Sequence, residues 1–330
     1  MNLSLPVRWG IIGCGDVCER KSGPALYKTN GSALVAVMRR DATKAEDYAR
    51  RHCVSRWYVD ADRLIADPDV DAVYIATPPS THAAYAIAAM RAGKPVYVEK
   101  PMASSFSECV EMNRVSTETG VPLLVAYYRR RLPYFLKVKE LLENGEIGDV
   151  IAISIRYHAP AYPQDGDPYN KPWRVQPAIA GAGYFYDMAC HTLDILDFLL
   201  GEIVAANGQK ANRAGLYDAE DTVTACFRFA SGVVGCGEWT FAAPAGARCD
   251  TVTISGSKGM IRFATFSFEP IVLQHGNFSS EFSFPRPEHI QQPLIETVVA
   301  HLCGRAQSPS DGFSAARANR VMDQILGKIN

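Results

Sequence analysis

Apolar residues in the first part of the chain form short continuous runs. These runs cover residues 8–13, 33–38, 56–59, 70–77, 94–99 and 121–127. Most of them do not alternate apolar with polar residues, which is typical of strands buried on both faces of a parallel sheet. Helical patterns separate the runs; Ser80 can cap one of them, and Ser104 or Ser105 another. Because strands and helices alternate with short loops, the pattern predicts a doubly wound α/β domain, the Rossmann fold, over residues 1–128.

The pattern changes in the rest of the chain. Two strong helical patterns, at 134–145 and 184–200, are followed by segments that alternate polar and apolar residues and are joined by short glycine turns. Such hairpins predict a large open, mainly antiparallel sheet with one face in water. We therefore expect an α+β domain for substrate binding and oligomerisation over residues 129–330, with a last helix that can pack back on the first domain.

Composition and charge narrow the class of protein. Of the 330 residues, 48% are hydrophobic and 21% are charged, and the net charge of −1 favours no nucleic-acid partner. The nine cysteines include no C-x-x-C pair and no zinc-site spacing, which is typical of a reduced chain without a metal site. Seven residues precede the first run, too few for a signal peptide, and no apolar run approaches the roughly 20 residues of a membrane helix. We expect a cytoplasmic protein with no membrane partner.

The first apolar run leads into the sequence G-C-G-D-V-C. Gly13 and Gly15 allow the backbone to approach a pyrophosphate, and the helix that Asp16 and Val17 open would turn its N-terminal amides to the anion. Cys18 stands where the dinucleotide fingerprint has Gly or Ala, and it is small enough for helix–strand packing. Because the loop joins the first strand to the first helix of the alternation, it predicts dinucleotide binding.

The end of the second run bears on the choice of cofactor. NAD-binding folds usually place an acidic residue here for the ribose hydroxyls, whereas this chain has Arg39 and Arg40, followed by Lys44. These cations would hold a 2′-phosphate through charge-assisted bonds, so the sequence favours NADP. Asp41 keeps NAD open, and a solvated basic turn without a binding role is the structural alternative.

Two further groups of polar residues stand out. The fifth run ends in opposite charges, Glu99 and Lys100, before Pro101, and such a strand end is ordinarily a surface turn because both charges need water or a partner. On the second helix of the α+β domain, Asp187 and His191 are spaced i, i+4 and fall on one side. An acidic–imidazole stripe on an otherwise apolar helix is either a surface ion pair or part of a site.

Taken together, four stretches resemble the glucose–fructose oxidoreductase, inositol dehydrogenase and rhizopine-catabolism (Gfo/Idh/MocA) family. They are RWGIIGCGDV, DAVYIATPPSTH, AGKPVYVEKP and GYFYDMACHTLDILDFLLG, in the family's order. The resemblance implies that Lys100 lies beside the nicotinamide and holds a substrate hydroxyl, and that Asp187 and His191 complete the site. The stretch PWRVQPAIAGAG resembles the W-R-x-x-P segment of the family's NADP-dependent anhydrofructose reductases. Further residues implied at the cofactor are Thr77, Pro78, His82, Glu99, Trp173 and Arg174.

This resemblance and the residue types predict a mechanism. Oxidation of an alcohol removes a hydride, which the nicotinamide takes, and a proton. Imidazole titrates near working pH, so His191 is the predicted acid/base, with Asp187 orienting it or gripping a second hydroxyl. Lys100 would donate to the reacting oxygen or, with its pKa lowered by burial, move the proton itself. Glu99 would brace this lysine, and a cis Lys100–Pro101 bond is predicted, since cis bonds are essentially a proline feature.

The sequence thus predicts an NADP-dependent oxidoreductase that moves a hydride between the nicotinamide and a hydroxyl or carbonyl carbon of a sugar, polyol or cyclic diol. An NAD-dependent inositol-type or dihydrodiol dehydrogenase is the alternative enzyme, and a cofactor-binding regulator without chemistry is the alternative of another class. The substrate itself is left open, since residues 127–130 differ from the asparagine-type pattern of many family members. We expect a homo-oligomer formed through the open sheet.

Overall fold

The computed structural model describes residues 2–167 and 169–329. In neither stretch is there a helix long and apolar enough to cross a membrane. The chain divides into two compact units, one formed by the residues up to 131 with 287–316, the other by 132–286 with the residues from 317 on.

The first unit also includes residues 287–316, which the sequence-based division places in the second domain, with only the last helix able to pack back on the first. Hydrogen bonds next to the last strand of the first unit account for this difference. The N–H of Val125 donates to the carbonyl of Ser310 at 3.0 Å, and the Ser310 hydroxyl donates to the carbonyl of Val125 at 2.8 Å. The segment therefore continues the first unit's own backbone pairing.

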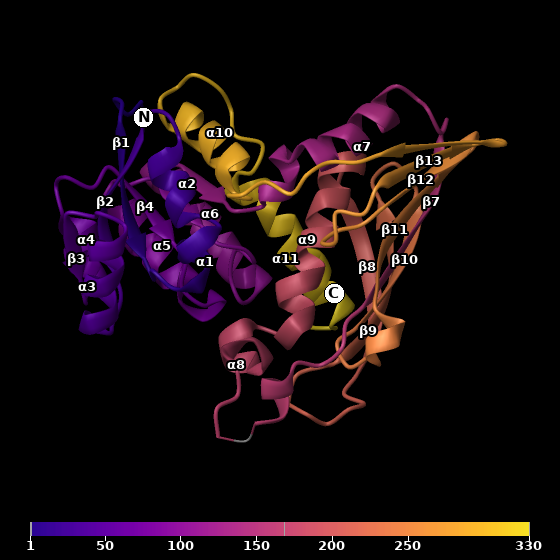
Figure 1. The fold of residues 1–330 in the computed structure, drawn as a ribbon, viewed down its shortest axis with the longest axis horizontal. Helices are drawn as coiled ribbons and strands as arrows, with labels where there is room; N and C mark the ends of the chain where they lie inside the picture. The colour runs from indigo at the N-terminus through magenta and orange to yellow at the C-terminus, as the bar shows by residue number, and fades with distance from the viewer. Residues whose placement is uncertain (1, 168, 330) are drawn as a thin grey trace. The chain divides into compact units, whose positions relative to one another are not determined.

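The first unit contains a six-stranded parallel sheet (Figure 1). Its strands are β1 (Val7–Ile12), β2 (Ser32–Met38), β3 (Arg56–Tyr58), β4 (Ala72–Ile75), β5 (Val96–Val98) and β6 (Leu123–Val125). Its helices are α1 (Asp16–Arg20), α2 (Gly23–Lys28), α3 (Ala42–Arg51), α4 (Ala61–Ala66), α5 (His82–Arg91), α6 (Phe106–Thr119) and α10 (Gln292–Leu302). The strand order β3-β2-β1-β4-β5-β6 reverses between β1 and β4, which confirms the predicted doubly wound fold.

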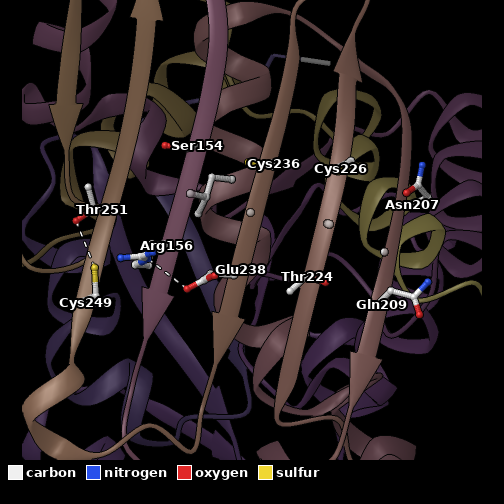
Figure 2. A pocket seen from close by; sticks show the side chains of 14 residues that line it. Ser154, Arg156, Asn207, Gln209, Thr224, Cys226, Cys236, Glu238, Cys249 and Thr251 are labelled. Atoms are coloured by element: carbon white, nitrogen blue, oxygen red, sulfur yellow. Dashed lines mark hydrogen bonds and ion pairs between the residues drawn. The ribbon is translucent and has the colours of Figure 1, made fainter.

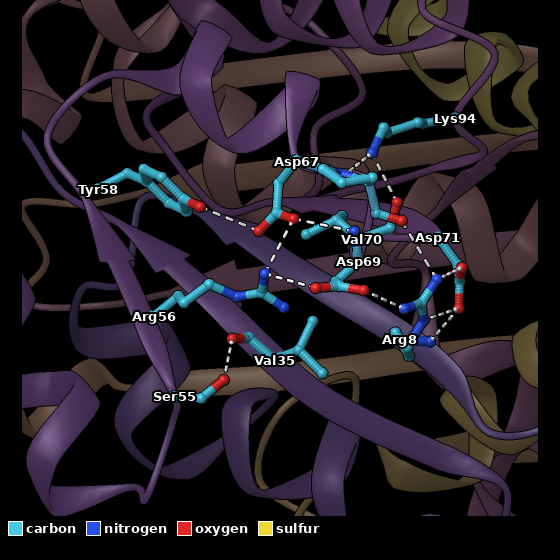
Figure 3. Close-up of polar contacts among 11 residues, drawn as sticks. Arg8, Val35, Ser55, Arg56, Tyr58, Asp67, Asp69, Val70, Asp71 and Lys94 are labelled. Atoms are coloured by element: carbon cyan, nitrogen blue, oxygen red, sulfur yellow. Dashed lines mark hydrogen bonds and ion pairs between the residues drawn. The ribbon is translucent and has the colours of Figure 1, made fainter.

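Ion pairs fix the edge of this sheet at which the strands begin (Figure 3). The guanidinium of Arg8 in β1 bonds both carboxylate oxygens of Asp71, just before β4, at 2.8 and 3.0 Å. Arg56 in β3 donates to Asp67 at 3.2 Å, and the Lys94 ammonium donates to the backbone carbonyl of Asp67 at 2.5 Å. These charges stabilise the amino edge, whereas ligands of such folds bind at the opposite, carboxyl edge.

The second unit is built on an eight-stranded sheet (Figure 1). Its strands are β7 (Val150–His158), β8 (Ile203–Ala211), β9 (Thr222–Phe229), β10 (Val234–Thr240), β11 (Cys249–Gly256), β12 (Gly259–Phe263), β13 (Ile271–His275) and β14 (Phe278–Phe282). They lie in the order β14-β13-β12-β11-β7-β10-β9-β8 and pair antiparallel, except for parallel β7 and β10. Helices α7 (Pro133–Glu143), α8 (Pro177–Ala180), α9 (Gly183–Leu200) and most of α11 (Gly312–Ile325) complete the unit. The predicted α+β fold with a mainly antiparallel sheet is confirmed.

One face of this sheet is covered and the other is open. On the covered face, Phe185 of α9 packs against Trp239 of β10 with ring centroids 5.3 Å apart, and Phe135 of α7 packs against Phe263 of β12 at 6.1 Å. Burial alternates along β9, whose buried and exposed residues follow the polar–apolar alternation of the sequence. Helix α9, which lies along the covered face in Figure 1, carries the acidic–imidazole pair of the predicted site.

Candidate functional site

Three of the predicted segments meet at the carboxyl edge of the parallel sheet. The register pairs Ile12 at the end of β1 with Ile75 at the end of β4, and Ile75 with Val98 at the end of β5. The N–H of Glu99 continues this pairing by donating to the carbonyl of Ile75 at 2.9 Å. Side by side at this edge are therefore residues 13–15, 77–78 and 99–100.

Gly13 shapes the loop after β1. Its φ of +92° is one that glycine adopts readily, and its N–H donates to the carbonyl of Met38 at 2.9 Å. A Cβ at this position would lie 2.6 Å from Thr77 Cγ2, so the loop packs closely against the loop after β4. Cys18 is fully buried, with its Sγ 3.8 Å from the carbonyl of Gly13, so its thiol fits the helix–strand contact.

The helix after this loop begins where the sequence predicts. Gly15 is the N-cap of α1, and Asp16 and Val17 are its first residues. Cys14, between the glycines, is fully buried, and burial raises the pKa of its thiol to about 11. Near pH 7 the loop therefore holds no anionic sulfur that would repel a phosphate. The loop and the close approach at its first glycine fit the pyrophosphate of a dinucleotide.

Arg39 follows β2 and lies against the glycine loop, where its Nη1 donates to the carbonyl of Cys14 at 3.1 Å. Asp41 is used differently, because it caps α3 by accepting the N–H of Lys44 at 3.1 Å, and the Lys44 ammonium lies 3.5 Å from it. The bond from this N–H holds the pKa of Asp41 below its usual range. The structure thus brings Arg39 to the loop, while Arg40 and Lys44 are exposed.

His82 lies beneath the edge of the sheet. Its ring is fully buried, with Nε2 2.8 Å from the carbonyl of Thr77 and Nδ1 3.1 Å from the carbonyl of Pro101. Burial lowers the pKa of the imidazole, so the ring is neutral near pH 7. The ring thus lies between the loop after β4 and the loop after β5, and its one N–H donates to one of the two carbonyls. A contact of His82 with the cofactor stays a prediction. The Lys100–Pro101 bond in the second of these loops is cis, as predicted.

Glu99 is buried, with 6% of its surface exposed, and three donors hold it. The hydroxyl of Tyr74 donates at 2.6 Å, Nε2 of Gln291 at 2.5 Å and the backbone N–H of Lys100 at 3.1 Å. Gln291 in turn accepts a bond from the Tyr97 hydroxyl at 3.1 Å. The surface-turn alternative is therefore excluded for the glutamate, whose carboxylate turns into the fold and fixes the backbone at Lys100.

The second unit carries the other predicted groups. Asp187 and His191 lie one turn apart on α9. The side chain of Asp187 is 13% exposed and accepts a bond from Nε of Arg174 at 3.2 Å. Cζ of Arg174 lies 4.5 Å from the centre of the Trp173 ring. His191 is 4% exposed, and its ring meets Phe266 edge-on at 5.7 Å. Both side chains are thus largely buried, with a guanidinium bonded to Asp187 and an aromatic ring against His191.

Two of these contacts could not be read from the sequence. Gln291 lies 192 positions from Glu99 and belongs to no motif; its one signal is its place just before the amphipathic pattern of α10. Arg174 is expected at the nicotinamide half of the cofactor, whereas the structure pairs it with Asp187, 13 positions away. Neither of these sequence separations corresponds to the period of a helix or a strand, so no local sequence pattern predicts either contact.

Comparison with known proteins identifies the family. Residues 7–127 match the oxidoreductase family with an NAD-binding Rossmann fold, and residues 135–262 match the GFO/IDH/MocA C-terminal domain. The chain belongs to the Gfo/Idh/MocA family. The predicted resemblance is confirmed, and with it the expectation that the protein is an NAD(P)-dependent oxidoreductase, an enzyme rather than a regulator.

Individual Gfo/Idh/MocA proteins match nearly the whole chain. An oxidoreductase of Formosa agariphila is 39% identical over 323 residues, which are 97% of this chain and 98% of that protein. Inositol 2-dehydrogenase of Acidothermus cellulolyticus is 30% identical over 335 residues, 97% of this chain and 92% of that protein. Among solved structures, levoglucosan dehydrogenase in complex with NADH and levoglucosan has a TM-score of 0.85 at 25% identity and covers 97% of this chain and 96% of its own.

Proposed function

We propose that this Gfo/Idh/MocA oxidoreductase uses NADP to interconvert a hydroxyl and a carbonyl carbon of a sugar, polyol or cyclic diol, with Lys100, Asp187 and His191 as catalytic groups. The observation that carries the proposal is the carboxyl edge of the parallel sheet, where the glycine loop at Gly13 lies beside the strand end that precedes Lys100. The substrate class follows the relatives, one named for inositol and another solved with levoglucosan.

Arg39 supports NADP over NAD. Its guanidinium bonds the carbonyl of Cys14 in the glycine loop, so a 2′-phosphate bound at the end of β2 would meet a cation held in place. Arg40 and Lys44 add positive charge to the same turn. Asp41, the acid that would otherwise suit the ribose hydroxyls, is held by its helix cap. The alternative is an NAD enzyme, since levoglucosan dehydrogenase was solved with NADH.

The chain's own groups supply the proton chemistry and the charge stabilisation. A bound nicotinamide supplies the acceptor or donor of the hydride. Nζ of Lys100 donates to the reacting oxygen and stabilises the negative charge that develops there. A ring nitrogen of His191 takes the hydroxyl proton in oxidation and returns it in reduction. In the alternative assignment Lys100 carries this proton and His191 only positions the substrate.

Arg174 limits the role of Asp187. A carboxylate that already accepts a charge-assisted bond is held in one orientation as an anion. Such a group is suited to orienting the His191 imidazole or gripping a second hydroxyl of the substrate, and less suited to carrying the proton. Trp173, which lies under the guanidinium of Arg174, keeps that cation in place through a cation–π contact.

A substrate panel tests the proposal. Sugars, polyols and cyclic diols are offered to the purified protein with NADP and with NAD, and the absorbance of the reduced nicotinamide is followed. We expect turnover with members of this class and a lower KM for NADP than for NAD. Turnover with NAD alone would favour the inositol-type or dihydrodiol dehydrogenase, and no turnover with any hydroxyl compound in either direction would overturn the substrate class.

The homo-oligomer remains part of the proposal. The open face of the second sheet supports it, because helices α7 and α9 pack on the other face. Light scattering in dilute buffer is the measurement. A particle mass of 36.1 kDa, that of one chain, at all concentrations would contradict the proposed self-association.

A further inference from the structure

Tyr157 of β7 lies on the covered face of the second unit's sheet. Its direct register partners are Trp239 in β10 and Asp250 in β11, and Trp239 packs against α9 on that face. The preceding residue, Arg156, turns to the open face and pairs with Glu238 at 3.2 Å (Figure 2). The proposed self-association through the open face therefore does not cover Tyr157.

The phenol ring of Tyr157 lies close to one of the proposed catalytic groups. Its centre is 5.1 Å from that of Phe266, the same ring that meets the His191 imidazole at 5.7 Å. It also packs against Phe241, at 5.9 Å. Two phenylalanine rings thus fix the orientation of the phenol, and one of them contacts the imidazole as well.

Asp250, the register partner in β11, holds this arrangement in place. Its carboxylate accepts the backbone N–H groups of Thr265, Phe266 and Ser267 at 3.0, 2.6 and 2.9 Å. The backbone that carries the Phe266 ring is therefore fixed beside the sheet. The phenol of Tyr157 thus lies next to a carboxylate that already serves three donors.

The hydroxyl of Tyr157 differs from those of other buried tyrosines in the second unit. Tyr157 is 8% exposed, yet within the described part of the unit its hydroxyl makes no hydrogen bond to the protein. The hydroxyl of Tyr184, by contrast, donates to Asp165 at 2.7 Å, and that of Tyr134 donates to the carbonyl of Glu269 at 2.8 Å. Buried polar groups ordinarily have a partner, so an unpartnered hydroxyl beside a proposed site indicates a ligand group.

This hydroxyl is accessible and neutral. The hydroxyl oxygen of Tyr217 also lacks a partner, but the protein encloses it fully. The oxygen of Tyr157 is not among the fully enclosed polar atoms of the described residues, so a ligand can reach it. Burial, with the carboxylates of Asp250 and Asp187 adding to it, raises the pKa of the Tyr157 phenol above its ordinary value. A neutral phenol can donate one hydrogen bond and accept another, which suits a hydroxyl of the substrate.

We propose that Tyr157 binds a hydroxyl of the substrate other than the one that reacts, and thereby selects polyhydroxylated sugars and polyols over their deoxy analogues. The inference rests on the proposed function, which places the reacting hydroxyl at His191. A further hydroxyl of the same molecule then meets the phenol next to the shared ring of Phe266. An analogue without this hydroxyl leaves the phenol unpaired in the complex, so it binds less tightly.

Calorimetric titration tests this inference without turnover, because an alcohol does not react with a reduced nicotinamide. The full chain is saturated with NADPH or NADH, whichever binds more tightly. The probes are myo-inositol, levoglucosan and, for the tighter of the two, deoxy analogues in which one hydroxyl at a time is replaced by hydrogen. Tyr157→Phe keeps the ring and removes the hydroxyl, so it should bind the parent compound about 2–10-fold more weakly.

The analogues identify the hydroxyl that Tyr157 binds. For the wild-type protein, loss of one particular hydroxyl should weaken binding by a similar factor, and for that analogue Tyr157→Phe and wild type should bind equally. Tyr217→Phe is the matched control, because it removes an unpartnered hydroxyl that is enclosed. It should bind every probe as the wild type does.

The outcomes separate this inference from the proposed activity. A Tyr157→Phe protein that binds like the wild type, or that loses affinity for the parent and all analogues by the same factor, would overturn the inference alone. A loss confined to one hydroxyl, in a protein that turns over no member of the panel, would support the inference and overturn the proposed hydride transfer. A wild-type protein that binds no probe would overturn the substrate class and, with it, this inference.

Discussion

Replacing Gln291 with methionine tests whether the buried contacts behind Lys100 position the carboxyl edge of the sheet. Gln291→Met nearly keeps the side-chain volume and removes both polar functions. The donor to Glu99 at 2.5 Å is lost, and so is the acceptor for the Tyr97 hydroxyl at 3.1 Å. Because the side chain of Gln291 is fully buried, water does not readily replace either bond.

The two losses set the expected size of the effect. A hydrogen bond to a charged group contributes roughly 1.5–3 kcal/mol, and a buried hydroxyl left without a partner costs roughly 1–3 kcal/mol. Allowing for rotation of the Tyr97 hydroxyl toward another acceptor, we expect the free energy of unfolding to fall by about 2–5 kcal/mol. That is a large part of the total stability of about 5–15 kcal/mol of an ordinary protein.

Turnover distinguishes positioning from stability alone. Glu99 also accepts the backbone N–H of Lys100, so a displaced carboxylate shifts the lysine, and an error of about 1 Å at a reacting group costs on the order of 10² in rate. We expect kcat to fall by about 10–10² in the folded variant, with a much smaller change in the dissociation constant of NADPH. Urea denaturation and steady-state kinetics measure the two effects.

Gln292→Met is the matched control for this prediction. Its amide bonds Glu296 at 3.2 Å on the surface, so the free energy of unfolding should change by less than about 0.5 kcal/mol and turnover should stay the same. A Gln291→Met protein that behaves like this control would refute the reasoning. A Gln291→Met protein with lower stability but an unchanged kcat would refute only the positioning role.

Three further predictions address the cofactor, the acidic group and pH. Arg39→Ala should weaken NADPH binding about tenfold or more and leave NADH binding nearly unchanged, because a bond to a charged group contributes roughly 1.5–3 kcal/mol; equal losses in fluorescence titrations with both cofactors would remove the NADP assignment. Arg174→Ala releases Asp187 and should lower kcat at least about tenfold. Arg174→Lys should recover part of this loss, since an ammonium keeps the charge without the planar fork of the guanidinium. An unchanged kcat in both variants would show that the ion pair has no part in turnover. The free energy of unfolding should fall as pH drops below about 6.5, because burial lowers the pKa of folded His82 and the unfolded chain takes up the proton first. In His82→Gln the free energy of unfolding should depend less steeply on pH over this range. Equal pH dependence of the two proteins, measured by urea titrations at a series of pH values, would contradict this prediction.

The parallel sheet and the glycine loop could be predicted because their causes are local. A strand covered on both faces has to be apolar at successive positions, and all four residues of β4 are indeed buried. The glycine fingerprint is equally local, since a positive φ and the close approach of Thr77 both require the missing Cβ at Gly13. The i, i+4 spacing likewise placed Asp187 and His191 one turn apart on α9.

Contacts made by distant segments could not be predicted in the same way. The burial of Glu99 depends on Gln291, which reaches it only because residues 287–316 return to the first unit. The pairing of Arg174 with Asp187 depends on the path of an irregular stretch before α9. The periodicity of a sequence does not indicate where distant segments of the chain meet. In the sequence, these side chains therefore look like ordinary surface residues.

Single-turnover hydride transfer in Lys100→Met, His191→Asn and the double variant tests the central claim most directly. With NADPH and the best carbonyl substrate of the panel, each single variant should bind cofactor normally and lose on the order of 10²–10⁴ in rate. Lys139→Met, on the surface of α7, is the control and should keep the wild-type rate. The double variant should lose much less than the product of the two single losses, because groups that act on one proton and one oxygen act as a unit. Losses that multiply, or a His191→Asn protein with a near-normal rate, would contradict the account.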